Sequence, residues 1–183
     1  MVDARREPPV VVETPWLRLL PPATRWVFQG PPHVRALAAA AWGVPFAAEA
    51  CRASTAAGRS ALWLGPEEYL LLAPDTAAER AAIGSLELSL QGVPHALVDV
   101  GHRQVALEVR SDQASVLLNS SCPLDLDLAV FPVGTCTRTV FAKADIVLWR
   151  TRRDVFHLEV WRSFLHYVTG ILTEVAREFS DAG

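Results

Sequence analysis

The sequence predicts an α+β protein made of two tandem antiparallel sheets, each covered by helices. Two observations carry this prediction. Short segments rich in β-branched and aromatic residues recur between turn residues, and segments with apolar residues three and four positions apart alternate with them. The resulting order is β-α-β-β-α-β and then β-α-β-β-β-α, so the two halves have similar element orders. No repeat of individual residues accompanies this similarity.

The first half is predicted at residues 23–96, behind a proline-rich arm at residues 1–22 in which Trp16 and several leucines are too apolar for a free tail. Residues 25–29 form a predicted strand. The Pro-Pro pair that follows opens a helix, since proline is tolerated in a first helical turn. Residues 46–58 are predicted to be a loop. The apolar stripe of the helix contains Val34, Leu37, Ala38, Ala41 and Trp42.

A hairpin and a second helix complete this half. Residues 60–64 and 69–73 flank the turn sequence GPEE, which predicts an antiparallel pair. Thr76 and Glu79 have the spacing of a capping box at a helix N-terminus. The apolar face of this helix is formed by Ile83, Leu86 and Leu90.

The second half is predicted at residues 97–183. Residues 96–100 and 104–109 are predicted strands on either side of Gly-His-Arg, and Ser111 is placed to cap a short helix that buries a few apolar residues. The segment at 122–134 contains two prolines and is predicted to be a connection without regular structure.

A three-stranded meander is predicted at residues 135–141, 146–150 and 155–161. A period of two places two sets of residues of the last strand on opposite faces, so we expect one buried face. These sets are Phe156, Leu158 and Val160 against His157 and Glu159. A final helix, capped by Ser163, must dock on the sheet to be stable. Its apolar stripe contains Phe164, Val168, Ile171, Val175 and Phe179.

The composition is that of a globular protein. Hydrophobic residues make up 51% of the 183 residues, and the net charge is 17 − 20 = −3. This balance argues against nucleic acid as the main partner, because phosphate binding needs clustered basic residues in excess. We expect no signal peptide and no membrane span. Three cysteines without a CxxC spacing indicate a reducing compartment, and so a cytoplasmic protein.

One short turn carries three residues suited to acid–base chemistry. Asp99 ends a predicted strand, and His102 and Arg103 follow it. A carboxylate beside an imidazole and a cation can form a polar site. The alternative is that Asp99 and Arg103 pair across a hairpin turn and His102 is solvated. The residues alone leave both interpretations open.

The remaining polar candidates favour structural roles. Cys122 and Cys136 are too far from other ligand residues for a tight zinc site and suit buried apolar positions. Asp125 and Asp127 could bind a cation, but their alternation with leucines favours a solvated face of an extended segment. The sequence contains no GxGxxG, P-loop, GxSxG or HExxH motif. We therefore predict no catalytic, cofactor-binding or metal-binding residue on this chain.

Six tryptophans in a small protein indicate a protein interface, because tryptophan is enriched at interface hot spots. Trp16 and Trp161 are the two that we expect to face a partner chain. The complete set of predicted interface residues is Trp16, His102, Arg103, Trp161 and Arg162.

Five segments resemble the gamma subunit family of heterotetrameric sarcosine oxidase. They are ALWLGPEEYLLLAP (61–74), LVDVGHRQVALEV (97–109), CPLDL (122–126), FPVGTCTRTV (131–140) and LEVWRSF (158–164). The first fifty residues match only loosely. Gly101 departs from the family pattern, which more usually has serine before His-Arg, so a hydroxyl role at this position is in doubt.

The resemblance implies a fold similar to that of the folate-binding aminomethyltransferases. It also implies a non-catalytic structural subunit of a complex that oxidises sarcosine to glycine, with hydrogen peroxide and formaldehyde or methylenetetrahydrofolate as further products. The implied partners are the alpha, beta and delta subunits, and these partners carry the implied FAD, FMN, NAD, zinc and tetrahydrofolate. The resemblance does not identify the exact N-methyl amine that is the substrate of the complex.

A second hypothesis is a stand-alone folate-binding one-carbon-transfer protein of the aminomethyltransferase type. That branch of proteins carries a KGCYxGQ-type signature. The nearest stretch here, FPVGTCT, lacks both the lysine and the glutamine.

Overall fold

The computed structural model describes residues 13–180, with side chains as far as Glu178, and divides the chain into two compact units. Residues Pro22–Gly101 form one unit, which we call the inserted unit. The segment before it, up to Pro21, joins the segment from His102 onward in the terminal unit, which contains both chain ends. The arm expected at residues 1–22 lies partly outside the described residues.

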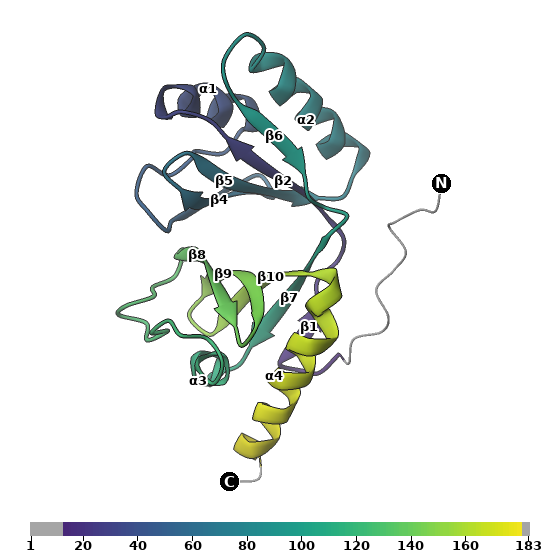
Figure 1. The fold of residues 1–183 in the computed structure, drawn as a ribbon, viewed down its shortest axis with the longest axis vertical. Helices are drawn as coiled ribbons and strands as arrows, with labels where there is room; N and C mark the ends of the chain where they lie inside the picture. The colour runs from purple at the N-terminus through teal and green to yellow at the C-terminus, as the bar shows by residue number, and fades with distance from the viewer. Residues whose placement is uncertain (1–12, 181–183) are drawn as a thin grey trace. The chain divides into compact units, whose positions relative to one another are not determined.

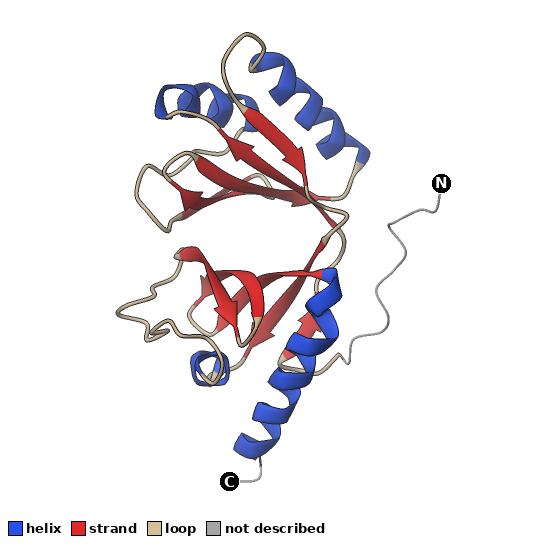
Figure 2. Ribbon diagram, viewed as in Figure 1, coloured by secondary structure: helices blue, strands red, loops and turns tan. Residues whose placement is uncertain are grey.

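The inserted unit is a five-stranded antiparallel sheet with two helices on one face (Figures 1 and 2). The strand order is β3-β4-β5-β2-β6. In chain order the elements are β2 (Ala23–Gln29), α1 (Pro32–Trp42), β3 (Ala53–Ala56), β4 (Arg59–Gly65), β5 (Glu68–Pro74), α2 (Ala77–Ser89) and β6 (Ala96–Asp99). The sequence therefore predicted both helices and the hairpin of this unit correctly.

The helices of the inserted unit pack on the sheet through large apolar side chains. Phe28 of β2, Trp42 of α1 and Leu86 of α2 are all completely buried. Pro32 stands at the first helical position of α1, and Gly43 ends the helix in the left-handed conformation with φ 76°, as its lack of a Cβ permits. Leu37, which the predicted stripe included, is 42% exposed.

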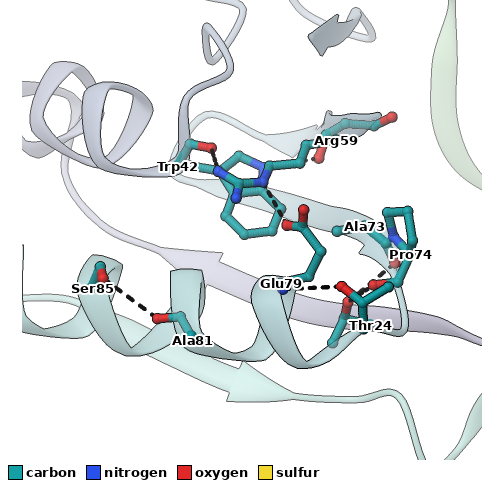
Figure 3. A network of polar contacts seen from close by, with 10 residues as sticks. Thr24, Trp42, Arg59, Ala73, Pro74, Glu79, Ala81 and Ser85 are labelled. Carbon is teal, nitrogen blue, oxygen red and sulfur yellow. Dashed lines mark hydrogen bonds and ion pairs between the residues drawn. The ribbon is translucent and has the colours of Figure 1, made fainter. Parts of the chain in front are cut away.

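Arg59 joins the end of α1 to the beginning of α2 (Figure 3). Its guanidinium donates to the Trp42 carbonyl at 2.8 Å and to Glu79 at 2.6 Å, and it lies 5.0 Å from the centre of the Trp42 ring. The Thr76 hydroxyl accepts from the backbone N–H of Glu79 at 3.2 Å. The capping box is therefore only half formed, because the Thr76 N–H donates to the Pro74 carbonyl instead.

The predicted loop at residues 46–58 contains a strand, β3, and that prediction was wrong. β3 pairs antiparallel with β4 across a tight turn in which Ala57 and Gly58 have φ 49° and 80°. Two positive φ values in a two-residue hairpin match the twist of the strands. Periodicity missed this strand because ASTA is short and carries no large apolar residue.

The terminal unit has a second five-stranded antiparallel sheet, in the order β1-β7-β10-β9-β8. Helix α4 lies along this unit in Figure 1 and, with α3, supplies side chains to the same apolar core. In chain order the elements are β1 (Leu17–Leu19), β7 (Gln104–Arg110), α3 (Ala114–Asn119), β8 (Cys136–Phe141), β9 (Ala144–Arg152), β10 (Val155–Trp161), a 3-10 turn (Arg162–Phe164) and α4 (Leu165–Ser180).

The three-stranded meander is confirmed as β8, β9 and β10, but the strands around Gly-His-Arg do not form a hairpin. β6 pairs with β2 of the inserted unit, whereas β7 pairs with β1 and β10 of the terminal unit. The expected boundary between residues 96 and 97 would separate β6 from its partner strand. The described end of the arm contributes β1, in which Leu17 pairs with Val109.

The expectation of one buried face in the meander was wrong. Phe156, Leu158 and Val160 are fully buried as predicted, but Glu159 on the opposite face is only 1% exposed. Cys136 and Val147, which share that opposite face, are buried as well. A period of two assigns residues to faces, but it contains no information about what covers each face.

Two helix details also differ from the prediction. The buried centre of α4 is Leu165, Val168 and Leu172, one position away from much of the predicted stripe, and Ser163 lies inside the preceding 3-10 turn. In α3 the capping position is Gln113 rather than Ser111. Ser111 still contributes, because its hydroxyl accepts from the Gln113 N–H at 3.1 Å.

Candidate partner interface

The antiparallel pairing of β7 and β10 brings three of the predicted interface residues together. Arg103 directly precedes β7, and Trp161 ends β10 opposite Gln104. The guanidinium carbon of Arg103 lies 5.5 Å from the centre of the Trp161 ring. The backbone N–H of Arg162 donates to the Arg103 carbonyl at 2.8 Å. We call Arg103, Trp161 and Arg162 the arginine–tryptophan cluster.

The arginine–tryptophan cluster has the composition of a binding hot spot. Trp161 is 43% exposed and Arg103 is exposed, although large aromatic side chains are usually buried. Tryptophan and arginine are the residue types most enriched among hot-spot residues. A guanidinium over an indole ring also holds the ring in one orientation at a modest energetic gain. The cluster therefore presents a pre-oriented ring and a positive charge at the surface.

The other two predicted interface residues lie differently. His102 is exposed and adjoins the cluster in the chain. Trp16 is half-buried against the core of the terminal unit, and its carbonyl accepts from the Arg110 N–H at 2.7 Å. It therefore lies at the opposite end of β7, about 20 Å from the cluster for a seven-residue strand.

A charge cluster surrounds Glu108 on β7. Arg18 and Arg110 each contact its carboxylate, at 3.0 and 2.9 Å. Burial by itself raises the pKa of Glu108, but the hydrogen bonds from Arg110 and Arg18 outweigh this and lower the pKa below its ordinary value. The cluster holds β1 and the end of β7 together through side chains as well as through the strand pairing.

The turn from Asp99 to Arg103 does not have the arrangement that either hypothesis for Asp99 assumed. The Asp99 carboxylate accepts from the backbone N–H of Gly101 at 2.8 Å, which is a local Asx turn. The hairpin that would pair Asp99 with Arg103 is not formed. A Cβ at Gly101 would lie 3.2 Å from the Asp99 carboxylate, so glycine leaves room for this turn.

A histidine–glutamate pair on β10 was missed by sequence reasoning. The His157 Nε2 and the Glu159 carboxylate are 2.8 Å apart, and the Glu159 side chain is completely buried. The His157 ring also packs on Trp149 of β9, with ring centres 5.6 Å apart. The sequence signal was two polar residues, His157 and Glu159, at alternate positions of a largely apolar strand. A buried carboxylate needs such partners, because an unpaired buried charge is costly.

The residues expected to be structural have local partners. None of the three cysteines, which all lie in the described part of the chain, forms a disulfide bond. Asp125 accepts from the Asp127 N–H at 2.9 Å, and Asp127 accepts from the Ala129 N–H at 2.8 Å. Among residues 13–180 there is no group of three or more His, Cys, Asp or Glu side chains that could hold a metal ion. No helix of the described segment is long and apolar enough to span a membrane.

Comparison with solved structures identifies relatives of the whole fold. The chain is similar to a chain of the heterotetrameric sarcosine oxidase from Corynebacterium sp. U-96 in complex with pyrrole 2-carboxylate, with a TM-score of 0.83 and 29% identity over 90% of this chain and 84% of that one. It also resembles the glycine cleavage system aminomethyltransferase T from Bartonella henselae, with a TM-score of 0.64 and 16% identity over 85% of this chain and 44% of that one. The second likeness concerns the fold alone.

Comparison of sequences gives the same result. Sarcosine oxidase subunit gamma from Corynebacterium sp. (strain U-96) is 31% identical over 150 residues, which cover 82% of this chain and 71% of the relative. The Arthrobacter sp. subunit is 30% identical over 70% of this chain, and the match spans only 62% of that relative's length. The model of the "Sarcosine oxidase, gamma subunit family" matches residues 31–178. The chain therefore belongs to the sarcosine oxidase gamma subunit family.

Proposed function

We propose that this chain is the gamma subunit of a heterotetrameric sarcosine oxidase, and that it acts as a non-catalytic structural subunit. The complex would oxidise sarcosine to glycine and release hydrogen peroxide, with the methyl carbon leaving as formaldehyde or as methylenetetrahydrofolate. The partners would be the alpha, beta and delta chains, in the cytoplasm. The three cysteines, all within the described residues, form no disulfide bond, which is consistent with a reducing compartment.

The observation that carries this proposal is that this chain, which belongs to the gamma subunit family, has the arginine–tryptophan cluster on its surface. A structural subunit needs a rigid surface that a partner can cover, and exposed Trp161 held by Arg103 provides one. His102 and Arg162 extend this surface along the chain. Trp16, at the opposite end of β7, would belong to a separate contact.

The proposal assigns the chemistry to the partners. FAD, FMN, NAD, zinc and tetrahydrofolate would be bound by the other subunits. This chain would contribute by holding the larger subunits in their working arrangement.

Co-expression tests the proposal directly. The tagged full-length chain should co-elute with the alpha and beta chains on size exclusion, and the complex should produce hydrogen peroxide from sarcosine. The isolated chain should not oxidise sarcosine. A chain that stays monomeric in the presence of those subunits, or that turns over the amine alone, would contradict the proposal.

A substitution tests whether the cluster is the docking surface. Trp161→Ala should weaken association with the larger subunits by about 2 kcal/mol, which is typical of a hot-spot tryptophan. Leu37→Ala on α1 is the matched control, because Leu37 is 42% exposed and Trp161 is 43% exposed. Equal affinities for the two variants would exclude the cluster as an interface.

The stand-alone folate-binding alternative has its own measurement. Calorimetry of the isolated chain with tetrahydrofolate should show no heat of binding if the chain is a structural subunit. Stoichiometric binding to the isolated chain would favour the one-carbon-transfer hypothesis instead.

A further inference from the structure

The connection between α3 and β8 exposes an unusual number of aliphatic side chains. Leu128, Val130 and Val133 are 37%, 61% and 48% exposed, and all three lie within six residues of one another. We call residues 124–133, with these side chains, the acidic loop, because it also carries Asp125 and Asp127. Large aliphatic residues grouped on one exposed segment are typical of a surface that is covered in an assembly.

The acidic loop is held rigidly although it has no regular secondary structure. Its first part is fixed by the two aspartate turns and by Asn119, whose side chain donates to the Leu124 carbonyl and accepts from the Leu126 N–H at 3.3 Å. Its later part is fixed by Arg150, which donates to the Phe131 carbonyl at 2.6 Å.

Arg150 anchors the loop at a cost in free energy, because its charge is buried. The residue is 3% exposed, donates also to the Ser115 hydroxyl at 2.5 Å and lies 4.5 Å from the centre of the Phe156 ring. Burial lowers the pKa of Arg150 below its ordinary value, because water is removed from the charge. A loop that is ordered before binding loses little conformational entropy when a partner covers it.

The exposed charges of the loop are negative, whereas the positive charge of Arg150, which contacts the loop, is buried. Residues 111–137 contain three aspartates, Asp112, Asp125 and Asp127, and no lysine, arginine, histidine or glutamate. The arginine–tryptophan cluster, in contrast, carries two arginines. One partner surface cannot complement both charges equally well.

We propose that the acidic loop is a second docking surface, which binds a partner subunit through an apolar patch rimmed by basic residues. This inference rests on the proposed function, since it takes the partner from the same complex. The aliphatic side chains form the centre of the contact, and the aspartates face the basic rim. The chain thus has two docking surfaces of opposite charge and joins two different regions of its partners.

The test measures binding of the full-length chain to a purified complex of the larger subunits that lacks this chain. Val130→Asp should lower the affinity on the order of tenfold, because it places a charge in the apolar centre. Leu88→Asp on α2 is the control, since Leu88 is 66% exposed and lies in the inserted unit. Circular dichroism should show that both variants are folded.

A second variant tests the charge. Asp125→Asn with Asp127→Asn removes two charges but keeps the side-chain oxygens that accept from the Asp127 and Ala129 N–H groups. It should lower the association rate several-fold at low ionic strength and leave it unchanged at high ionic strength.

Each outcome decides between the proposals. Wild-type binding with an unaffected Val130→Asp variant overturns the second docking surface and leaves the proposed function intact. If Trp161→Ala is the only variant that loses binding, the second docking surface is likewise overturned and the proposed function is left intact. A wild-type chain that does not bind the larger subunits overturns both. Self-association of the isolated chain that Val130→Asp abolishes would make a second copy the occupant and overturn the commitment to a partner subunit.

Discussion

Two arginines lie over aromatic rings at opposite ends of one strand, and only one of them is available for binding. Arg150 stacks on Phe156 near the beginning of β10 and is buried, with its donors directed at the Phe131 carbonyl and the Ser115 hydroxyl. Arg103 stacks on Trp161 at the end of β10, where both side chains are exposed. An arginine–aromatic pair is structural where internal acceptors surround it. Where solvent surrounds such a pair, it can contact a partner, which is the role that we propose for Arg103 and Trp161.

The largest predicted effect on stability concerns the buried pair of Arg150 and Phe156. Arg150→Met should lower the free energy of unfolding by about 2–4 kcal/mol, because the Phe131 carbonyl and the Ser115 hydroxyl lose their donor. Urea denaturation measures this effect, and hydrogen exchange should show faster opening of residues 124–133. Arg103→Met is the matched control and should lower stability by no more than about 1 kcal/mol, because its contact with Trp161 is exposed. Equal destabilisation by the two variants would contradict the distinction between the pairs.

The exposed pair should contribute only weakly to stability. A double-mutant cycle with Arg103→Met and Trp161→Ala should give a coupling free energy of about 0.5–1 kcal/mol, as is typical of an exposed cation–π contact. Urea denaturation of the two single variants and the double variant provides the cycle. A coupling above about 2 kcal/mol would mean that the contact is desolvated and structural, like that of Arg150.

The smallest predicted effect concerns the two exposed arginines, Arg18 and Arg110, that contact the carboxylate of Glu108. Because the folded-state pKa of Glu108 is lowered, its stabilisation is fully present above the pKa of the unfolded state and is lost as the pH falls through the folded-state value. Glu108→Gln should therefore reduce the loss of stability on acidification, by no more than about 1 kcal/mol. The effect is measured by comparing the free energies of unfolding of the wild type and the variant at neutral pH and at a pH below the ordinary pKa of glutamate. An unchanged pH dependence in the variant would contradict the role of Glu108.

Local pattern predicted most of the fold. The stripe of α1 apart from Leu37, the cap of α2 at Thr76 and the buried apolar set of β10 all depend on neighbours within a few residues, and the structure confirms them. The same holds for the α+β class. β3 was missed because its residues are small, and β1 because it is three residues long.

The candidate interface was predictable as residue types but not as a surface. Trp161 stood out by its side chain, and Arg103 by its place beside His102 in a turn. Their contact depends on the register that places Trp161 opposite Gln104, which links residues almost sixty positions apart. Arg150 and Glu159 gave weaker signals still, since a charged residue in a strand normally indicates solvent.

The sequence alone determined the element types, the faces on which residues lie, the absence of familiar catalytic motifs and the family, because these properties depend on neighbouring residues and short motifs. Tertiary structure alone decided which arginine is buried, which strands around Gly-His-Arg belong to which sheet, and that Glu159 is buried beside His157. Burial and long-range strand register depend on contacts between distant segments, and no local period contains them.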